Sequence, residues 1–95
     1  MKLLILIHEE ALDDQVTPVF RRHMAVTRYS KIEGVVGARM DALAETDFET
    51  DRRNNMVLAI ADDDTISGIV ADIRALRDRV GQGLRGAVID AQTVI

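Results

Sequence analysis

A glycine-rich stretch near the end of the chain is the first place where this sequence could bind a ligand. Gly81, Gly83 and Gly86 fall within six residues. Glycine adopts positive φ without strain and lets a backbone approach a ligand closely. Such a loop can expose amide N–H groups that bind an anion, although most short glycine-rich loops between a helix and a strand only turn the chain. Both interpretations stay open from the loop alone.

A second group of ligand-binding residue types follows the apolar run at the start of the chain. His8, Glu9 and Glu10 end this run. Imidazole nitrogens and carboxylate oxygens bind metal ions, but the spacing matches no standard metal motif. The alternative is a strand end in solvent. His23 falls on the apolar face of an expected helix, which is typical of a histidine at the edge of a core.

The sequence gives catalysis little support. No nucleophile lies in a recognisable catalytic motif, and neither histidine belongs to one. Asp62, Asp63 and Asp64 are three adjacent carboxylates, which favour a helix cap over a site for a hard cation. We therefore expect a protein that is not an enzyme.

The composition narrows the class of protein further. The chain has 95 residues, which predicts one domain, and a net charge of −4, which argues against nucleic acid or an anionic membrane as partner. Aromatic residues make up 3%, so the core must be aliphatic. The absence of cysteine excludes disulfides and thiolate metal sites and fits a cytoplasmic protein. The first apolar run is too short to span a membrane.

Periodicity and turn residues predict the elements that position these groups. We expect strands over 2–8, 26–36, 56–61 and 87–95, helices from about Asp14 to Met24 and from 62 to 80, and a polar loop over 38–55. Asp13 and Asp14 are natural N-caps for the first helix. Pro18 is tolerated only in a first turn, so this helix begins no earlier than about Asp14, or at Pro18 itself with Thr17 as cap. Gly34 and Gly37 are expected to bend or bulge the second strand.

The order β-α-β-loop-β-α-β predicts an α+β, ferredoxin-like fold in one domain over 1–95. Its four-stranded antiparallel sheet would carry both helices on one face. The loop over 38–55 is either a disordered insertion or an arm that becomes ordered when a ligand binds at its base. Arg39 at one end and Arg52 and Arg53 at the other suit a phosphate, or pair with the acidic residues of the loop.

Together these segments resemble the PII signal-transduction proteins and their PII-like relatives. Met-Lys-Leu-Leu-Ile-Leu-Ile resembles the first PII strand, and Ala-Leu-Asp-Asp-Gln-Val the start of the first helix. Val26–Gly37 resembles the second strand, and 38–55 occupies the place of the T-loop, which contacts target proteins. Asp-Asp-Thr-Ile from Asp63 resembles the entry of the second helix, and Arg79–Arg85 resembles the B-loop.

The resemblance implies a homotrimer with adenine nucleotides (AMP, ADP or ATP) in clefts between subunits. It implies these nucleotide-binding residues: Ile7, Arg28, Gly37, Arg39, Gly81, Gln82, Gly83 and Arg85. It implies these partner-binding residues of the arm: Asp41, Glu45, Phe48, Arg52 and Arg53. The sequence departs from the family where Leu84 replaces a B-loop lysine, where the arm lacks tyrosine, and where the family continues into a basic C-terminal loop but this sequence ends at Ile95.

Three functions are consistent with these features. The leading one is a trimeric PII-like sensor whose arm regulates a partner such as a membrane transporter or a protein of nitrogen metabolism. The second is a metal-responsive trimer similar to CutA-type proteins, which would use His8, Glu9 and Glu10. The third is a purely structural oligomerisation domain.

Overall fold

The computed structural model describes residues 1–23, 28–37 and 52–95. Its elements are, in order, β1 (Lys2–Glu9), the short 3₁₀ helix η1 (Glu10–Leu12), α1 (Asp13–Arg22), β2 (Arg28–Gly37), β3 (Arg52–Ala61), α2 (Asp63–Val80) and β4 (Leu84–Asp90). None of the helices in these ranges is long and apolar enough to cross a membrane.

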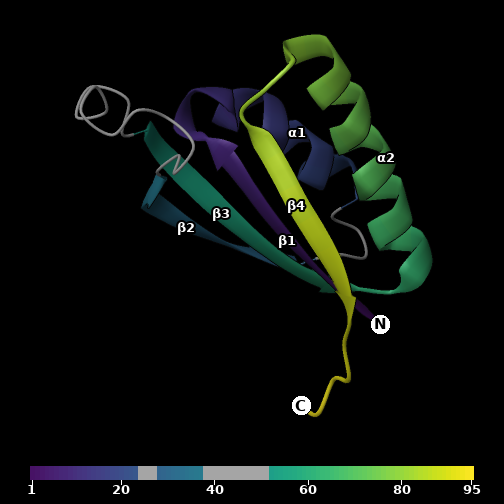
Figure 1. Cartoon of the computed structure of the whole chain (residues 1–95). Helices are drawn as coiled ribbons and strands as arrows, with labels where there is room; N and C mark the ends of the chain where they lie inside the picture. The colour runs from purple at the N-terminus through teal and green to yellow at the C-terminus, as the bar shows by residue number, and fades with distance from the viewer. Residues whose placement is uncertain (24–27, 38–51) are drawn as a thin grey trace.

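The four strands form one antiparallel sheet in the order β2-β3-β1-β4. Both helices cover the same face of this sheet (Figure 1). The predicted ferredoxin-like arrangement is therefore confirmed for the described residues. Strands β2 and β4 are the two edges, and each has a neighbouring strand on one side only among these residues.

The two-residue period of β1 divides the sheet into a covered and an uncovered face. Leu4, Leu6 and His8 are buried, whereas the side chains between them are only half-buried. Directly paired residues share a face, so the register carries this division to the neighbouring strands. Val57 and Ala59 of β3 lie opposite Leu6 and Leu4 and are buried as well. The core therefore lies between this face and the two helices.

Helix α2 begins and ends as the sequence predicts. The side chain of Asp62 is the N-cap and accepts a hydrogen bond of 2.8 Å from the amide of Thr65. The helix ends at Val80, and its C-cap Gly81 has φ of 83°, the left-handed conformation that favours glycine. Between these ends, Ile66, Ile69 and Leu76 are buried against the sheet.

The first helix begins close to its predicted start, but the prediction that Pro18 lies in its first turn was wrong. Helix α1 begins at Asp13, behind the turn Glu10–Leu12, and Pro18 lies inside it. The missing amide of Pro18 leaves the carbonyl of Asp14 without its helical donor. Both residues are exposed, so water can bond this carbonyl, while the helix buries Phe20 and two valines on its other side.

Two strand boundaries also differ from the prediction. Strand β3 begins at Arg52, so residues 52–55 belong to the sheet and not to the loop. Strand β4 runs over Leu84–Asp90 and not over 87–95. Its length follows that of β1, because Leu84 pairs with His8 and Asp90 with Lys2. The expected bulge in β2 is confirmed: its register shifts between Ile32 and Val35, around Gly34 with φ of 73°.

The N-cap of α2 gives a direct test of the helix boundary. We expect Asp62→Ala to lower the free energy of unfolding measurably, because the Thr65 amide loses its acceptor. Urea denaturation followed by circular dichroism measures this change. The control Asp64→Ala removes a first-turn charge but no cap bond, so it should cost only a few tenths of that amount. Equal losses in both variants would contradict the assignment.

Candidate functional site

One end of the sheet brings together several of the residues that the sequence singled out. Here the end of β1 lies beside the glycine-rich loop that joins α2 to β4 (Figure 1). Ile7 pairs with Arg85 in the sheet, and the amide of Glu9 donates a 2.9 Å hydrogen bond to the carbonyl of Gly83. The loop is therefore attached to β1 through its backbone.

The geometry of the loop explains two of its glycines. Gly81 and Gly83 both have φ of 83°. The amide of Gly81 donates a 2.7 Å hydrogen bond to the carbonyl of Arg77, which completes the end of α2. A Cβ atom on Gly83 would lie 2.9 Å from the side-chain Cδ of Glu9. Turn geometry and close contact with Glu9 thus account for both glycines without a ligand.

The electrostatics of this loop are unfavourable for an anion at its backbone. The loop follows the C-terminus of α2, where the helix dipole places partial negative charge. The carboxyl group of Glu9 adds further negative charge beside Gly83. Positive charge is supplied instead by side chains: Arg77 and Arg79 in the last turn of α2, and Arg85 on β4.

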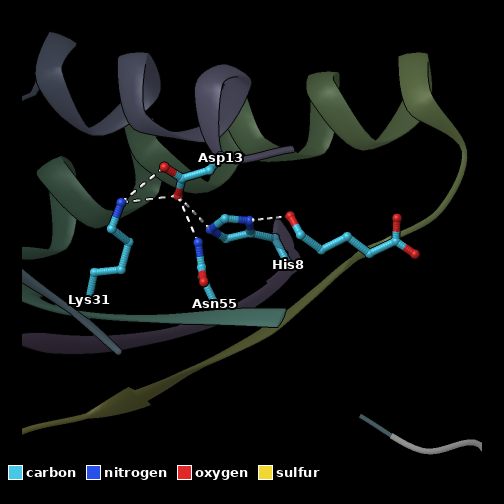
Figure 2. Close-up of polar contacts among 5 residues, drawn as sticks. His8, Asp13, Lys31 and Asn55 are labelled. Atoms are coloured by element: carbon cyan, nitrogen blue, oxygen red, sulfur yellow. Dashed lines mark hydrogen bonds and ion pairs between the residues drawn. The ribbon is translucent and has the colours of Figure 1, made fainter. Parts of the chain in front are cut away.

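A polar cluster lies near the end of β1, between the sheet and the start of α1. Figure 2 shows His8, Lys31 and Asn55 converging on the carboxyl group of Asp13. Lys31 donates to both carboxyl oxygens, at 3.1 and 3.0 Å, and the amide nitrogen of Asn55 donates to Oδ1 at 3.0 Å. These four residues, the Asp13 cluster, come from β1, α1, β2 and β3.

His8 is completely buried in this cluster, so the alternative of a strand end in solvent was wrong for His8, whereas Glu10 is exposed. Its Nδ1 atom lies 2.9 Å from the carbonyl oxygen of Glu9. Because a carbonyl only accepts hydrogen bonds, Nδ1 must carry a proton. Its Nε2 atom lies 3.6 Å from Oδ1 of Asp13 and has no hydrogen-bond partner among the described residues.

Asp13 carries the charge that the cluster is built around. Burial disfavours its ionised form, but the hydrogen bonds from Lys31 and Asn55 outweigh burial, and the pKa of Asp13 lies below its ordinary value. The prediction that Asp13 caps α1 was wrong, because the N-cap position is Leu12, which makes no side-chain cap bond. The sequence carried no signal for the hydrogen bonds of Asp13 with Lys31 and Asn55, because these residues are far apart in the chain.

The structure does not assemble the alternative metal site. His8 faces the core, the side chain of Glu9 packs against Gly83, and Glu10 is exposed in η1. Across residues 1–23, 28–37 and 52–95, no three His, Asp or Glu side chains are grouped so that they could hold a metal ion. Glu9 and Glu10 instead line an open pocket of about 470 Å³ with Ala11 and Arg53.

The other predicted nucleotide-binding residues are not collected in one place. Arg28 pairs with Ile60, which in turn pairs with Leu3. Leu3 is four residues from Ile7, so Arg28 lies about 13 Å farther along the sheet than the glycine-rich loop. Gly37 ends β2, on the opposite edge of the sheet from β4. Within one chain, the predicted residues therefore lie in three separate places: the glycine-rich loop with Ile7 and Arg85, then Arg28, then Gly37.

Several predicted positions of the arm fall outside the described residues. These are Arg39, Asp41, Glu45 and Phe48. Arg52 and Arg53 belong to β3 and so lie in the sheet.

A groove between α2 and β4 is the feature that sequence reasoning missed. It encloses about 430 Å³ and is lined mainly by apolar residues, with Arg74 and Arg77 of α2 and Arg85 at the start of β4. Arg74 and Arg77 are exposed, on the side of α2 away from its buried residues. The sequence alone did not show that this face borders the open edge strand β4.

The Asp13 cluster predicts a pH-dependent contribution to stability. We expect Asp13→Ala to lower the free energy of unfolding by about 1–3 kcal/mol at neutral pH, because the buried Asn55 amide loses its acceptor. A carboxyl group with a lowered folded pKa stabilises the fold above its unfolded pKa and loses that effect as the pH falls through the folded pKa.

Denaturation of both proteins between pH 7 and pH 2 tests this prediction. The difference between wild type and Asp13→Ala should be constant above about pH 4 and shrink below it. Asp14→Ala is the matched control, because its side chain is exposed on the same turn. A difference that stays constant down to pH 2 would contradict the role of the ionised carboxylate.

Comparisons with known proteins place this geometry in context. No protein-family model matches the chain, and no curated protein matches its sequence. The likeness to known proteins is one of structure: CPII from Thiomonas intermedia K12, bound to ADP, AMP and acetate, aligns with a TM-score of 0.75 at 18% identity over 99% of this chain and 88% of that chain.

Two further solved structures extend this result. A DUF3240 family protein from Shewanella baltica OS155 aligns with a TM-score of 0.70 at 9% identity, over 98% of this chain and 91% of that chain. A PII-like signalling protein from Thermus thermophilus aligns with a TM-score of 0.55 at 12% identity, over 93% of this chain and 83% of that chain. The predicted resemblance is thus confirmed in structure: at low sequence identity, this chain has the fold of the PII-like proteins.

Proposed function

We propose that the chain is a non-enzymatic, PII-like regulatory protein that forms a homotrimer and binds an adenine nucleotide between its subunits. The observation that carries this proposal is the distance between the predicted binding residues within one chain. The glycine-rich loop and Arg28 lie at opposite ends of one sheet. A neighbouring subunit can supply the residues that lie far from the loop, so the proposed site would form only when subunits assemble.

The uncovered face of the sheet supports assembly. Its four strands contribute these apolar residues: Leu3, Ile5, Ile7, Ile32, Met56, Leu58, Ile60, Ala87 and Ile89. Ile32, Ile60 and Ile89 are 48%, 47% and 51% exposed. A continuous apolar surface of this kind marks a protein–protein interface in a soluble protein. The described residues of the chain do not cover it, so we assign it to contacts between subunits.

The likeness to CPII supports the choice of effector. Solved structures of CPII contain ADP and AMP, and the chain aligns with the ADP- and AMP-bound form over nearly its full length. In the proposed mechanism the nucleotide favours one state of the segment over 38–51, which changes the affinity of that segment for a partner protein. A membrane transporter or a protein of nitrogen metabolism, in the cytoplasm, is the partner class that we propose.

The trimer is tested by light scattering on the purified protein. We expect the mass of three chains, and we expect Ile60→Lys to give a folded monomer because it buries a charge in the interface. Val94→Lys is the control, since Val94 is 83% exposed beyond the sheet. Wild-type protein that stays monomeric at all concentrations, or trimers of Ile60→Lys, would contradict the assigned interface.

Nucleotide binding is tested by calorimetry with AMP, ADP and ATP. We expect the trimer to bind at least one of them, and the Ile60→Lys monomer to bind none, because each proposed site needs two subunits. Absence of heat with all three nucleotides, in a folded trimer, would reject the nucleotide and leave a structural oligomerisation domain. Binding to the monomer with unchanged affinity would instead place the site within one chain.

A further inference from the structure

The groove between α2 and β4 has an apolar floor and an open side. Leu4 and Leu6 of the core lie at its base, and Val70 and Ile73 of α2 form one wall. A Cβ atom on Gly86, in β4, would lie 2.6 Å from the carbonyl oxygen of Ile5, so this position admits no side chain that could fill the groove. The volume of about 430 Å³ falls within the range of small-molecule sites.

Two guanidinium groups stand at the rim of this apolar groove. Arg74 and Arg77 are exposed and lie about one turn apart on α2. Neither makes an ion pair with another residue of the described chain, in contrast to Arg22, which lies 3.3 Å from Asp72. Arginine binds phosphate oxygens through two parallel N–H groups, so this pair suits a phosphorylated ligand.

The groove adjoins the glycine-rich loop. Leu84 and Arg85 line the groove and directly follow Gly83. The loop itself is poorly suited to phosphate, because the Gly81 amide is bonded to Arg77, the helix C-terminus is negative, and the Glu9 carboxyl group lies against Gly83. Any phosphate near this loop must therefore be recognised by side chains.

We propose that the groove between α2 and β4 takes the base of a nucleotide, that Arg74 and Arg77 bind its phosphates, and that the neighbouring subunit covers the open side of the groove. This inference rests on the proposed nucleotide-binding function and assigns recognition to residues that the family resemblance does not. The apolar floor matches the planar, weakly polar base, and the two positive charges match the phosphate chain. Because the charges lie at the phosphate end, affinity rises from AMP through ADP to ATP.

The test measures AMP and ATP affinities of the full chain by calorimetry. Arg74→Gln/Arg77→Gln should weaken ATP binding by at least about tenfold and AMP binding less, since it removes charge-assisted contacts to the phosphate chain. Arg21→Gln is the control, because this exposed arginine belongs to α1 and not to the groove. Val88 lines the groove and is 41% exposed. Val88→Phe narrows the part of the groove that takes the base, so it should weaken the binding of AMP and of ATP by the same factor.

The outcomes separate this inference from the function on which it rests. If wild type binds ATP and the double variant binds it equally well, the assignment of the arginines is overturned and the proposed function stands. If the double variant loses thermal stability but binds ATP as well as wild type does, the assignment is likewise overturned. The aliphatic stems of the two arginines would then only cover apolar surface. If the wild-type trimer binds no nucleotide, the proposed function and this inference fall together.

Discussion

The pairing of β1 with both of its neighbours is the constraint on which the rest of the structure depends. Strand β1 lies between β3 and β4, so its alternation decides which side of the whole sheet is covered. One set of its side chains forms the core under the helices. The other set produces the uncovered apolar face that we assign to subunit contacts. A shift of the register by one residue would exchange the two faces.

The same strand positions the chemistry at its end. His8 is the last residue of β1 on the covered face, and its burial brings the Asp13 cluster together. Glu9 follows on the other face and binds the glycine-rich loop through its amide. A single strand end thus fixes the start of α1 and the loop after α2. The loop is held by the fold itself, and we therefore look for ligand recognition in the side chains around it.

The sequence predicted the elements that depend on local residue types. The cap at Asp62, the glycine end of α2 and the bulge near Gly34 follow from turn chemistry, and the structure contains all three. Prediction failed for the elements whose boundaries are set by contacts between residues distant in the chain. Burial of Phe20 and two valines stabilises α1 although Pro18 lies beyond its first turn, and pairing with β1 sets the length of β4. The groove at Arg74 and Arg77 was missed because its second wall is a strand that follows the helix in the chain.

The central claim is that each effector site is shared by two subunits, with Arg74 and Arg77 from one and Arg28 from the next. Mixed trimers of two variants test it most directly: Arg28→Gln and Arg74→Gln/Arg77→Gln, unfolded together and reassembled. Each pure variant trimer should bind ATP weakly. A mixed trimer contains one interface with all three arginines intact, so the account predicts recovery of wild-type affinity at one site per trimer. Mixed trimers that bind no better than the pure variants would contradict it.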